Sequence, residues 1–369
     1  MTVGIVGAGQ LGRMLALAGY PLGIDFLFLD QSAGVPAAAL APVLVGDFAD
    51  RTLLRRLAKR SEVLSFDWEN ISVAALRAAT RDLRTRIAPP LRALATGQDR
   101  LAEKRLFERL RIPTTRYAAV DTKADLARAV AGIGMPGVLK TRRLGYDGKG
   151  QCVIRNAAAL TVAWRELRGS ALLYEELVPF EAEVSALAVR ARDGSEAYYP
   201  LTRNWHDDGI LRLSVAPWAA AALERQALRH IRAVLREFNY VGMLAIEFFV
   251  KQGRLIANEL APRVHNSGHW TIEGAVTSQF ENHLRAITGL PLGSAAAVGH
   301  AAMVNLIGRM PPVASVLSMP GIHLHDYGKT PRPGRKLGHC TLVAATAADR
   351  NRRTRQLLRR LTVSLSGAP

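Results

Sequence analysis

The 369-residue sequence contains only two cysteines, Cys152 and Cys340, and their spacing is not that of metal ligands. Two cysteines cannot form a disulfide framework, so we expect a protein of a reducing compartment. No apolar run is long enough to span a bilayer. The N-terminus lacks a basic segment, and its apolar stretch is interrupted by Gln10 and Arg13, which argues against a signal peptide. The sequence therefore predicts a cytoplasmic protein with no membrane partner.

Acidic residues are scarce, with 31 Asp and Glu against 49 Lys and Arg, and the net charge is +18. Such a charge can indicate nucleic-acid binding, because a basic face attracts phosphates. Here the arginines are spread over helix-like stretches, and the densest group, residues 350–360, has no interleaved aromatic residue. We therefore expect no nucleic-acid partner and expect part of the charge to steer small anionic substrates.

The chain is too long for one ordinary core, so two or three domains are expected. Up to about residue 96, short apolar runs alternate with helix-like stretches, which predicts a parallel, doubly wound sheet. Residues 97–290 mix glycine-rich hairpins with helices, as in an α+β domain. Residues 291–369 are rich in turns, and we interpret them as a small C-terminal domain that contributes a loop to the site.

The first motif is a glycine turn, Gly7-Ala-Gly9-Gln-Leu-Gly12, between a predicted strand and a predicted helix. Asp30 closes the next predicted strand. The pattern fits the dinucleotide fingerprint, in which glycines let the backbone approach a pyrophosphate at a helix N-terminus. The same N–H groups suit any phosphate. On this motif alone, an NAD enzyme and another phosphate-binding protein are both possible.

The second motif is the segment 140–151, in which an apolar strand ending at Lys140 enters a loop with three glycines and Lys149. A plain glycine-rich hairpin seldom carries so many Lys, Arg and Asp residues. We interpret the segment as a flexible hairpin that folds over a triphosphate.

The third motif, residues 174–178, is a short acidic and apolar segment after a predicted strand. Its backbone can meet an adenine edge, with Glu175 accepting from the exocyclic amine and Glu183 holding ribose hydroxyls. Standing alone, the segment would be an ordinary strand exit.

The fourth motif is a pair of carboxylates, Glu247 and Glu259, on two strands joined by the turn at Gln252-Gly253. An antiparallel hairpin brings both carboxylates, and the amide of Asn258, to one end. Oxygen ligands at this spacing suit Mg²⁺ bound to nucleotide phosphates. We predict a magnesium site here rather than two solvated glutamates.

Polar residues follow the predicted metal ligands directly, in the segment 258–271. Arg263, His265, Asn266, Ser267 and His269 cannot all be buried without partners. We interpret this loop as an anion site beside the γ-phosphate of a nucleotide.

A basic proline-glycine loop occupies residues 325–339 and carries Lys329, Arg335 and Lys336. Such a loop can cradle a phosphate monoester, although a solvated basic loop is the alternative.

Together these segments resemble the 5-(carboxyamino)imidazole ribonucleotide synthases of purine biosynthesis, over nearly the whole chain. The resemblance is carried by residues 7–14, 140–151, 175–178, 258–271 and 327–339. It implies an ATP-grasp fold with a Rossmann-like N-terminal domain and a homodimer. It also implies a reaction in which ATP, bicarbonate and 5-aminoimidazole ribonucleotide give the carbamate, ADP and phosphate by way of carboxyphosphate, with Mg²⁺ as cofactor.

The resemblance also implies site residues. Metal ligands would be Glu247 and Glu259, and the residues expected at ATP are Arg100, Lys140, Gly145, Tyr146, Asp147, Gly148, Lys149, Gly150, Gln151, Glu175, Glu176, Leu177, Val178, Glu183, His206, Asn258 and Glu259. Those expected at the ribonucleotide, bicarbonate or carboxyphosphate are Gln10, Leu11, Tyr146, Asp147, Arg263, His265, Asn266, Ser267, Lys329, Arg335 and Lys336. The catalytic candidates are Asp147 for the amine proton, Arg263 for carboxyphosphate, and Lys149.

Three features depart from the family pattern. Leu144 stands where glycine is expected, which would stiffen the hairpin loop, and Val264 replaces a proline after Arg263, which would loosen a turn. Residues 66–70 are a variant of a glutamate-rich segment. The alternatives are another ATP-grasp ligase, such as a formate-using purine transformylase or a biotin-carboxylase-like enzyme, an NAD-dependent dehydrogenase, and a basic nucleic-acid-binding protein.

Overall fold

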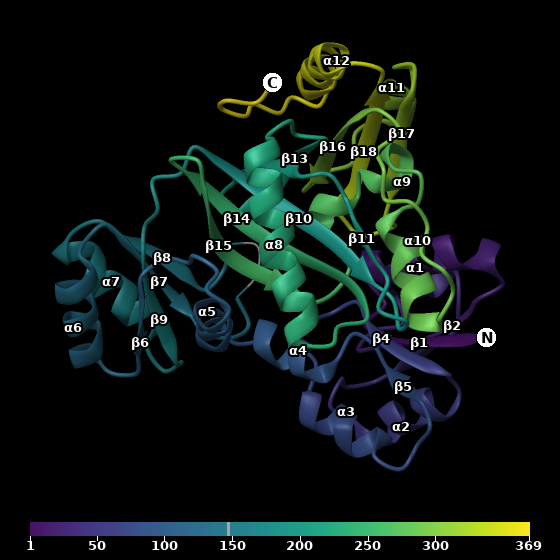
Figure 1. Cartoon of the computed structure of the whole chain (residues 1–369), viewed down its shortest axis with the longest axis horizontal. Coiled ribbons are helices and arrows are strands. Elements are labelled where there is room, and N and C mark those ends of the chain that lie inside the picture. The colour runs from purple at the N-terminus through teal and green to yellow at the C-terminus, as the bar shows by residue number, and fades with distance from the viewer. Residues whose placement is uncertain (146–147) are drawn as a thin grey trace.

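The computed structural model describes residues 1–145 and 148–369 and begins with a five-stranded sheet in the order β3-β2-β1-β4-β5. All four strand pairs are parallel, as predicted for this part of the chain. Helices cover the sheet in the purple and indigo part of Figure 1. The elements are β1 (Thr2–Val6), α1 (Gln10–Gly19), β2 (Asp25–Asp30), β3 (Val43–Val45), α2 (Arg51–Lys59), β4 (Val63–Phe66), α3 (Val73–Thr80) and β5 (Arg86–Ile87), with 3-10 turns at Tyr20–Leu22 and Pro36–Ala39.

Two helices, α4 (Leu91–Gly97) and α5 (Arg100–Arg109), lead from this sheet to a small lobe. The lobe is a four-stranded antiparallel sheet in the order β6-β9-β7-β8, with two helices beside it, on the left of Figure 1. The hairpin predicted within 139–154 is formed by its strands β7 and β8. The elements are β6 (Tyr117–Val120), α6 (Lys123–Ile133), β7 (Gly137–Thr141), β8 (Gln151–Ile154), α7 (Ala157–Leu167) and β9 (Leu172–Glu176).

The largest sheet contains nine strands and runs through the rest of the chain. Its order is β15-β14-β10-β12-β13-β16-β18-β17, with β11 paired to β10. The strands are β10 (Ala182–Arg190), β11 (Glu196–Tyr198), β12 (Thr202–Asp207), β13 (Ile210–Ala216), β14 (Gly242–Lys251), β15 (Arg254–Ala261), β16 (His300–Ile307), β17 (Ile322–Asp326) and β18 (Lys336–Ala344). The boundary predicted at residue 291 therefore lies inside a continuous sheet, because β16 pairs with β13.

Helices flank this sheet, and they are α8 (Ala221–Glu237), α9 (Thr271–Gly274), α10 (Gln279–Thr288), α11 (Val313–Leu317) and α12 (Ala347–Arg360), with a 3-10 turn at Asn266–Gly268. α8 is amphipathic and buries Leu223, Ala227 and Ile231 against the sheet. α10 packs against both α1 and β14, so it joins the N-terminal domain to the large sheet.

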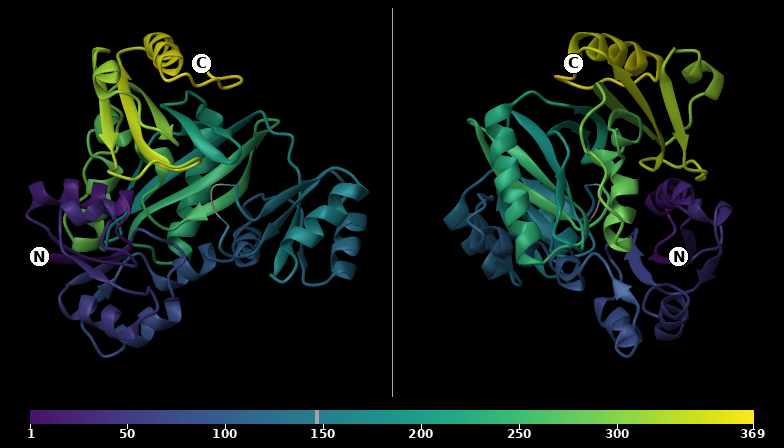
Figure 2. Two further views of the ribbon diagram at one scale, coloured as in Figure 1. Left: turned by 180° about the vertical axis from the view of Figure 1, so that it is seen from behind. Right: turned by 45° about the vertical axis from the view of Figure 1, so that its right-hand side comes forward.

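One apolar core extends across the junction between these two parts. Phe28 and Leu15 of the N-terminal domain belong to the same buried cluster as Trp270 and Phe280. Figure 2 shows the two parts side by side in both views. Burial of large apolar side chains on both sides holds the two parts in contact. Within the described ranges, no helix is long and apolar enough to cross a membrane.

Candidate active site

A cavity of about 770 Å³ lies where the N-terminal sheet, the small lobe and the large sheet meet. Most of the residues predicted to be functional line it, although they come from distant parts of the sequence. These are Gln10, Leu11, Arg100, Lys140, Gly145, Gly148, Lys149, Gln151, Leu177, Glu183, His206, Glu247, Asn258, Glu259, Arg263, His265, Asn266, Lys329, Arg335 and Lys336.

Some predicted residues are placed elsewhere. Tyr146 and Asp147 lie outside the described residues. Gly150, Glu175, Glu176, Val178 and Ser267 are described but are not part of the cavity lining. Glu176 forms an ion pair with Arg116 at 2.6 Å, and Ser267 is fully buried beside His265.

The glycine turn is occupied by carboxylates of the chain itself. The N–H of Ala8 donates to Asp30 at 2.7 Å, and the N–H of Gly12 donates to Asp67 at 3.0 Å. A Cβ on Gly9 would lie 2.9 Å from a carboxylate oxygen of Asp67, so a larger residue here would require that carboxylate to shift. Because internal carboxylates take these N–H groups, the geometry disfavours a dinucleotide pyrophosphate at this turn.

Two lysines and a glutamate form a buried ion cluster behind the cavity. Lys140 and Lys104 each lie 3.2 Å from a carboxylate oxygen of Glu175, and Thr115 donates to the same carboxylate at 2.9 Å. Burial alone would raise the pKa of Glu175, but the charges of the two lysines outweigh it and lower this pKa. Among the described residues the Oε1 atom of Glu175 has no hydrogen-bond partner, so its role as acceptor for an adenine amine stays a prediction. Its place is to hold Lys140 at the cavity.

The hairpin loop begins with a residue in an unfavourable backbone conformation. Leu144 has φ +64°, in the left-handed region that glycine favours, and its side chain is exposed. Gly148 also has positive φ, and a Cβ there would lie 2.7 Å from the carbonyl oxygen of Asp208 in the turn between β12 and β13. The loop therefore approaches the large sheet closely at Gly148. Its backbone is strained at Leu144, because leucine disfavours a positive φ.

The two predicted metal ligands lie opposite each other. Glu247 on β14 is the direct partner of Glu259 on β15, and both carboxylates lie within 4.8 Å of a ring nitrogen of His265. Burial raises the pKa of Glu247 to about 7, and the nearby negative charge of Glu259 also raises it against the opposing charge of His206. Among the described residues, the side-chain oxygen of Asn258 is buried without a hydrogen-bond donor. Two close carboxylates and an unsatisfied amide oxygen fit a divalent cation.

His206 and Glu183 form a pair beside these carboxylates. The Nδ1 atom of His206 lies 2.9 Å from the Glu183 carboxylate. Burial would lower the pKa of His206, but the hydrogen bond to Glu183 and the charge of Glu247 raise it to about 9. The imidazole is therefore positively charged at neutral pH, beside the paired carboxylates.

Arg263 is held by an acidic residue of the N-terminal domain. Its guanidinium lies 2.8 Å from the carboxylate of Glu69 and donates to the carbonyl of Val264 at 2.9 Å. Val264 is 1% exposed and packs in the core that the two domains share. This packing opposes a loosening of the turn, which stays a prediction.

The basic loop of the C-terminal part reaches the N-terminal domain. The ammonium group of Lys329 donates to the side-chain oxygen of Gln10, which begins α1. Arg335 donates to the carbonyl of Thr330 at 3.1 Å, and this contact closes the loop on itself. Residues separated by more than 300 positions thus share one wall of the cavity.

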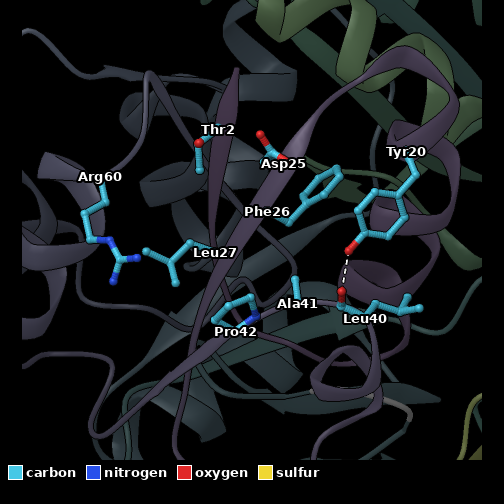
Figure 3. A pocket seen from close by; sticks show the side chains of 9 residues that line it. All are labelled: Thr2, Tyr20, Asp25, Phe26, Leu27, Leu40, Ala41, Pro42 and Arg60. Atoms are coloured by element: carbon cyan, nitrogen blue, oxygen red, sulfur yellow. Dashed lines mark hydrogen bonds between the residues drawn. The ribbon is translucent and has the colours of Figure 1, made fainter.

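A second cavity of about 390 Å³ lies at the N-terminal sheet and is drawn in Figure 3. Tyr20 and Phe26 line it with their rings, and the Tyr20 hydroxyl donates to the carbonyl of Leu40. Of the predicted functional residues that the structure describes, none lines this cavity. We therefore assign the chemistry to the larger cavity.

Three residues of the site were missed by the sequence analysis. Lys104 is fully buried in a helix, and its role depends on Glu175, which lies 71 positions away. Asp67 and Glu69 were noted only as part of a variant segment. The signal that was available for them is the position directly after a buried strand, where ligands gather in parallel sheets.

Comparison with known proteins agrees with this geometry. Family models match residues 1–98 as a ribonucleotide synthetase preATP-grasp domain, residues 105–280 as an ATP-grasp domain, and residues 301–353 as a phosphoribosylaminoimidazole carboxylase C-terminal domain. Fold and site thus define the chain as an ATP-dependent ligase of the ATP-grasp class.

Relatives that are similar over nearly the whole chain identify the family within this class. An N5-carboxyaminoimidazole ribonucleotide synthase of Pseudomonas aeruginosa is 51% identical over 348 residues, which are 94% of this chain and 96% of the relative. The N5-carboxyaminoimidazole ribonucleotide synthetase of Thermus thermophilus has a crystal structure with a TM-score of 0.91 at 48% identity, covering 98% of both chains. The chain belongs to the family of N5-carboxyaminoimidazole ribonucleotide synthases, enzymes of purine biosynthesis.

One solved relative shows which ligands a member of the family binds. The N5-carboxyaminoimidazole synthase of Aspergillus clavatus was crystallised with ADP and 5-aminoimidazole ribonucleotide. Its structure has a TM-score of 0.90 at 29% identity and covers 98% of both chains.

Proposed function

We propose that the chain carboxylates 5-aminoimidazole ribonucleotide with bicarbonate at the expense of ATP, by way of carboxyphosphate and with Mg²⁺ as cofactor. The observation that carries this proposal is the convergence of three features in one cavity. They are the lysine hairpin of the small lobe, the paired carboxylates of the large sheet and the basic loop of the C-terminal part. The hairpin suits the triphosphate, the carboxylates suit a divalent cation bound with it, and the basic loop suits the phosphate of the ribonucleotide.

ATP lies between the small lobe and the large sheet in this proposal. Val153, Leu177 and Phe180 line that part of the cavity with apolar surface, and Phe180 stacks on Phe249 with ring centroids 4.8 Å apart. An adenine ring fits such a surface, and Glu183 can accept from ribose hydroxyls. Lys140, Lys149 and Arg100 supply the positive charge that the triphosphate needs.

Glu247, Glu259 and the oxygen of Asn258 would hold a divalent cation, which we assign as Mg²⁺. The donor set is made of oxygen atoms, as this ion prefers. When bound, the ion supplies charge stabilisation for phosphoryl transfer. The positive charge of His206 adds to this on the other side of the carboxylates.

Bicarbonate attacks the γ-phosphorus in line, so the oxygen–phosphorus bond of carboxyphosphate forms as the bond to ADP breaks. Arg263 presents a planar donor group to this anion, and Glu69 fixes its orientation. Carboxyphosphate then releases CO₂ and phosphate beside the exocyclic amine of the ribonucleotide. A closed cavity limits its hydrolysis by water.

The phosphate of the ribonucleotide binds at the basic loop in this proposal. Lys329, Arg335 and Lys336 line the cavity at its C-terminal wall. Gln10 reaches the same place from α1 and touches Lys329. The amine therefore points toward Arg263 and the carboxyphosphate, and Asp147 remains the predicted group for its proton.

We also infer a homodimer in the cytoplasm. The support is the family resemblance, together with the two free cysteines, Cys152 and Cys340. Light scattering at micromolar concentration tests the dimer directly.

Isotope transfer tests the carbon donor and the route. With ¹⁸O-bicarbonate, ATP and the ribonucleotide, one labelled oxygen should appear in inorganic phosphate for each ADP formed, because carboxyphosphate cleaves between carbon and the bridging oxygen. Unlabelled phosphate alongside full carboxylation would contradict the proposed route. ADP release without any carboxylated product would contradict the proposed substrate.

A further inference from the structure

We propose that Gln279 and Asn305, two buried amide side chains behind the cavity, are positioning residues for the substrate loop that carries His265 and Asn266. The inference rests on the proposed function of that loop. Neither amide belongs to the described lining of the cavity, whereas His265 and Asn266 do. Both amides are almost completely buried, at 0% and 2% exposure.

Gln279 holds the backbone of His265 from the first turn of α10. Its side-chain oxygen accepts from the N–H of His265 at 2.9 Å, and its side-chain nitrogen donates to the carbonyl of the same residue at 2.6 Å. The amide thus pairs with this residue as a neighbouring strand would. A Cβ on Gly268 would lie 2.7 Å from the Gln279 side chain, so the loop wraps closely around it.

The position of Gln279 is itself fixed by its own backbone. Its N–H donates to the hydroxyl of Thr271 at 3.0 Å, and that hydroxyl donates to the carbonyl of Gly268 at 2.6 Å. Ser278 caps the helix by accepting from the N–H of Glu281 at 3.1 Å. α10 therefore transmits a fixed geometry to the loop.

Asn305 holds the side chain of Asn266 from strand β16. The two amides form a reciprocal pair, with nitrogen–oxygen distances of 2.7 and 3.1 Å. The nitrogen of Asn305 also donates to the carbonyl of Leu211 at 2.8 Å. Because Asn305 sits in the middle of a paired strand, its amide has little freedom to turn, and so it fixes which face of the Asn266 amide meets the cavity.

The loop that carries His265 and Asn266 lies beside the paired carboxylates. The Nε2 atom of His265 is 3.9 Å from a carboxylate oxygen of Glu247, and Arg263 precedes it by two residues. Buried hydrogen-bond networks rigidify the groups they hold, and losing such supporting partners typically costs tenfold to hundredfold in activity. The two amides should therefore affect use of the ribonucleotide and bicarbonate more than binding of ATP, which we place between the small lobe and the large sheet.

The test compares isosteric variants. Asn305→Asp removes the donor toward Asn266 and Leu211, and Gln279→Glu removes the donor toward His265. Asn305→Ser is a milder change that keeps one hydroxyl donor if the aspartate variant does not fold. We expect kcat/KM for the ribonucleotide to fall by about tenfold to hundredfold, while KM for MgATP changes by less than about twofold.

Asn282 offers a matched control on the same helix. Its amide is also fully buried and holds a loop, since it donates to the carbonyl of Gly293 at 3.1 Å and accepts from the N–H of the same residue at 2.8 Å. That loop is not part of the described cavity lining. Asn282→Asp should lower the melting temperature as much as Asn305→Asp does, yet leave kcat/KM for the ribonucleotide unchanged.

Two results would overturn the proposal. One is that kcat/KM falls by the same factor for the ribonucleotide and for MgATP, and that in every variant, the Asn282 control included, this fall is proportional to the drop in melting temperature. The other is a crystal structure of Asn305→Asp in which the Asn266 amide keeps its position. The crystal structure tests the positioning role without any measurement of activity. A wild-type enzyme that does not respond to the ribonucleotide would contradict the proposed function but not the positioning role.

Discussion

At the scale of single residues, the site contains buried charged side chains, each in contact with a side chain of opposite charge. Lys104 and Lys140 share Glu175, and Arg263 is paired with Glu69. Buried charges of this kind are costly to leave alone, so removal of one partner is far more damaging than loss of an exposed ion pair. The pairs place cations around a cavity where three anionic reactants would meet.

Replacement of Lys104 by methionine tests the buried cluster. Lys104→Met leaves Glu175 with Lys140 as its remaining lysine, so we expect a loss of about 3 kcal/mol in the free energy of unfolding and a raised KM for MgATP. Arg109→Met on the same helix is the control, because Arg109 forms an exposed ion pair with Glu237. The control should lose less than about 1 kcal/mol. If urea unfolding gave the same loss of unfolding free energy for both variants, the buried cluster would stabilise the fold no more than the exposed ion pair does.

At the scale of elements, the hairpin β7–β8 and the strand pair β14–β15 carry the lysines and carboxylates that line the cavity. Both were predicted from the sequence, because a glycine-rich loop between apolar runs and two carboxylates beside a turn are local patterns. The β14–β15 pairing sets Glu247 directly opposite Glu259. The hairpin loop carries its strain at Leu144, where the backbone adopts a conformation that glycine prefers.

Replacement of Leu144 tests that strain. The left-handed conformation costs a leucine roughly 1–2 kcal/mol, and glycine avoids this cost but loses about 0.5–1 kcal/mol in chain entropy. We therefore expect Leu144→Gly to be as stable as the wild type or slightly more stable, with equal or faster turnover. Leu144→Ala keeps the strain and should gain nothing. A glycine variant that melts below the alanine variant would refute this interpretation.

At the scale of the whole molecule, distant segments are joined by buried contacts that no local pattern shows. The parallel N-terminal sheet, the hairpin β7–β8 and many of the charged lining residues could be predicted from periodicity, motifs and resemblance. The pairing of β13 with β16 could not, because strand partners far apart in sequence leave no local signal. For the same reason Lys104, Gln279 and Asn305 were missed, since each acts through a residue that only the fold brings near.

Acid should loosen the junction between the domains. His283 of α10 is buried between Ser65, at 3.0 Å, and the N–H of Met243, at 3.1 Å. Burial lowers the pKa of His283 from 6.5 to about 3, so the unfolded chain binds a proton more readily than the folded one. Its contribution to stability is complete above pH 6.5 and is lost as the pH falls from 6.5 toward 3, by about 5 kcal/mol at most.

Urea unfolding between pH 7.5 and 4 measures this effect. His283→Asn keeps an acceptor for Met243 but cannot take up the proton, so its stability should fall less steeply with acid than that of the wild type. His323→Gln changes an exposed histidine and should keep the wild-type slope. Identical slopes for all three proteins would mean that His283 does not link the junction to pH.

In the proposed function, one cavity couples ATP cleavage to the ribonucleotide. The most direct measurement is ADP release from MgATP with and without 5-aminoimidazole ribonucleotide and bicarbonate, in the wild type and in Glu259→Gln. We predict strong stimulation of the wild type by the ribonucleotide, and its loss in the variant because the amide lacks one of the two negative charges proposed to hold the metal. ATP turnover that does not respond to the ribonucleotide, or a variant with full activity, would contradict the account.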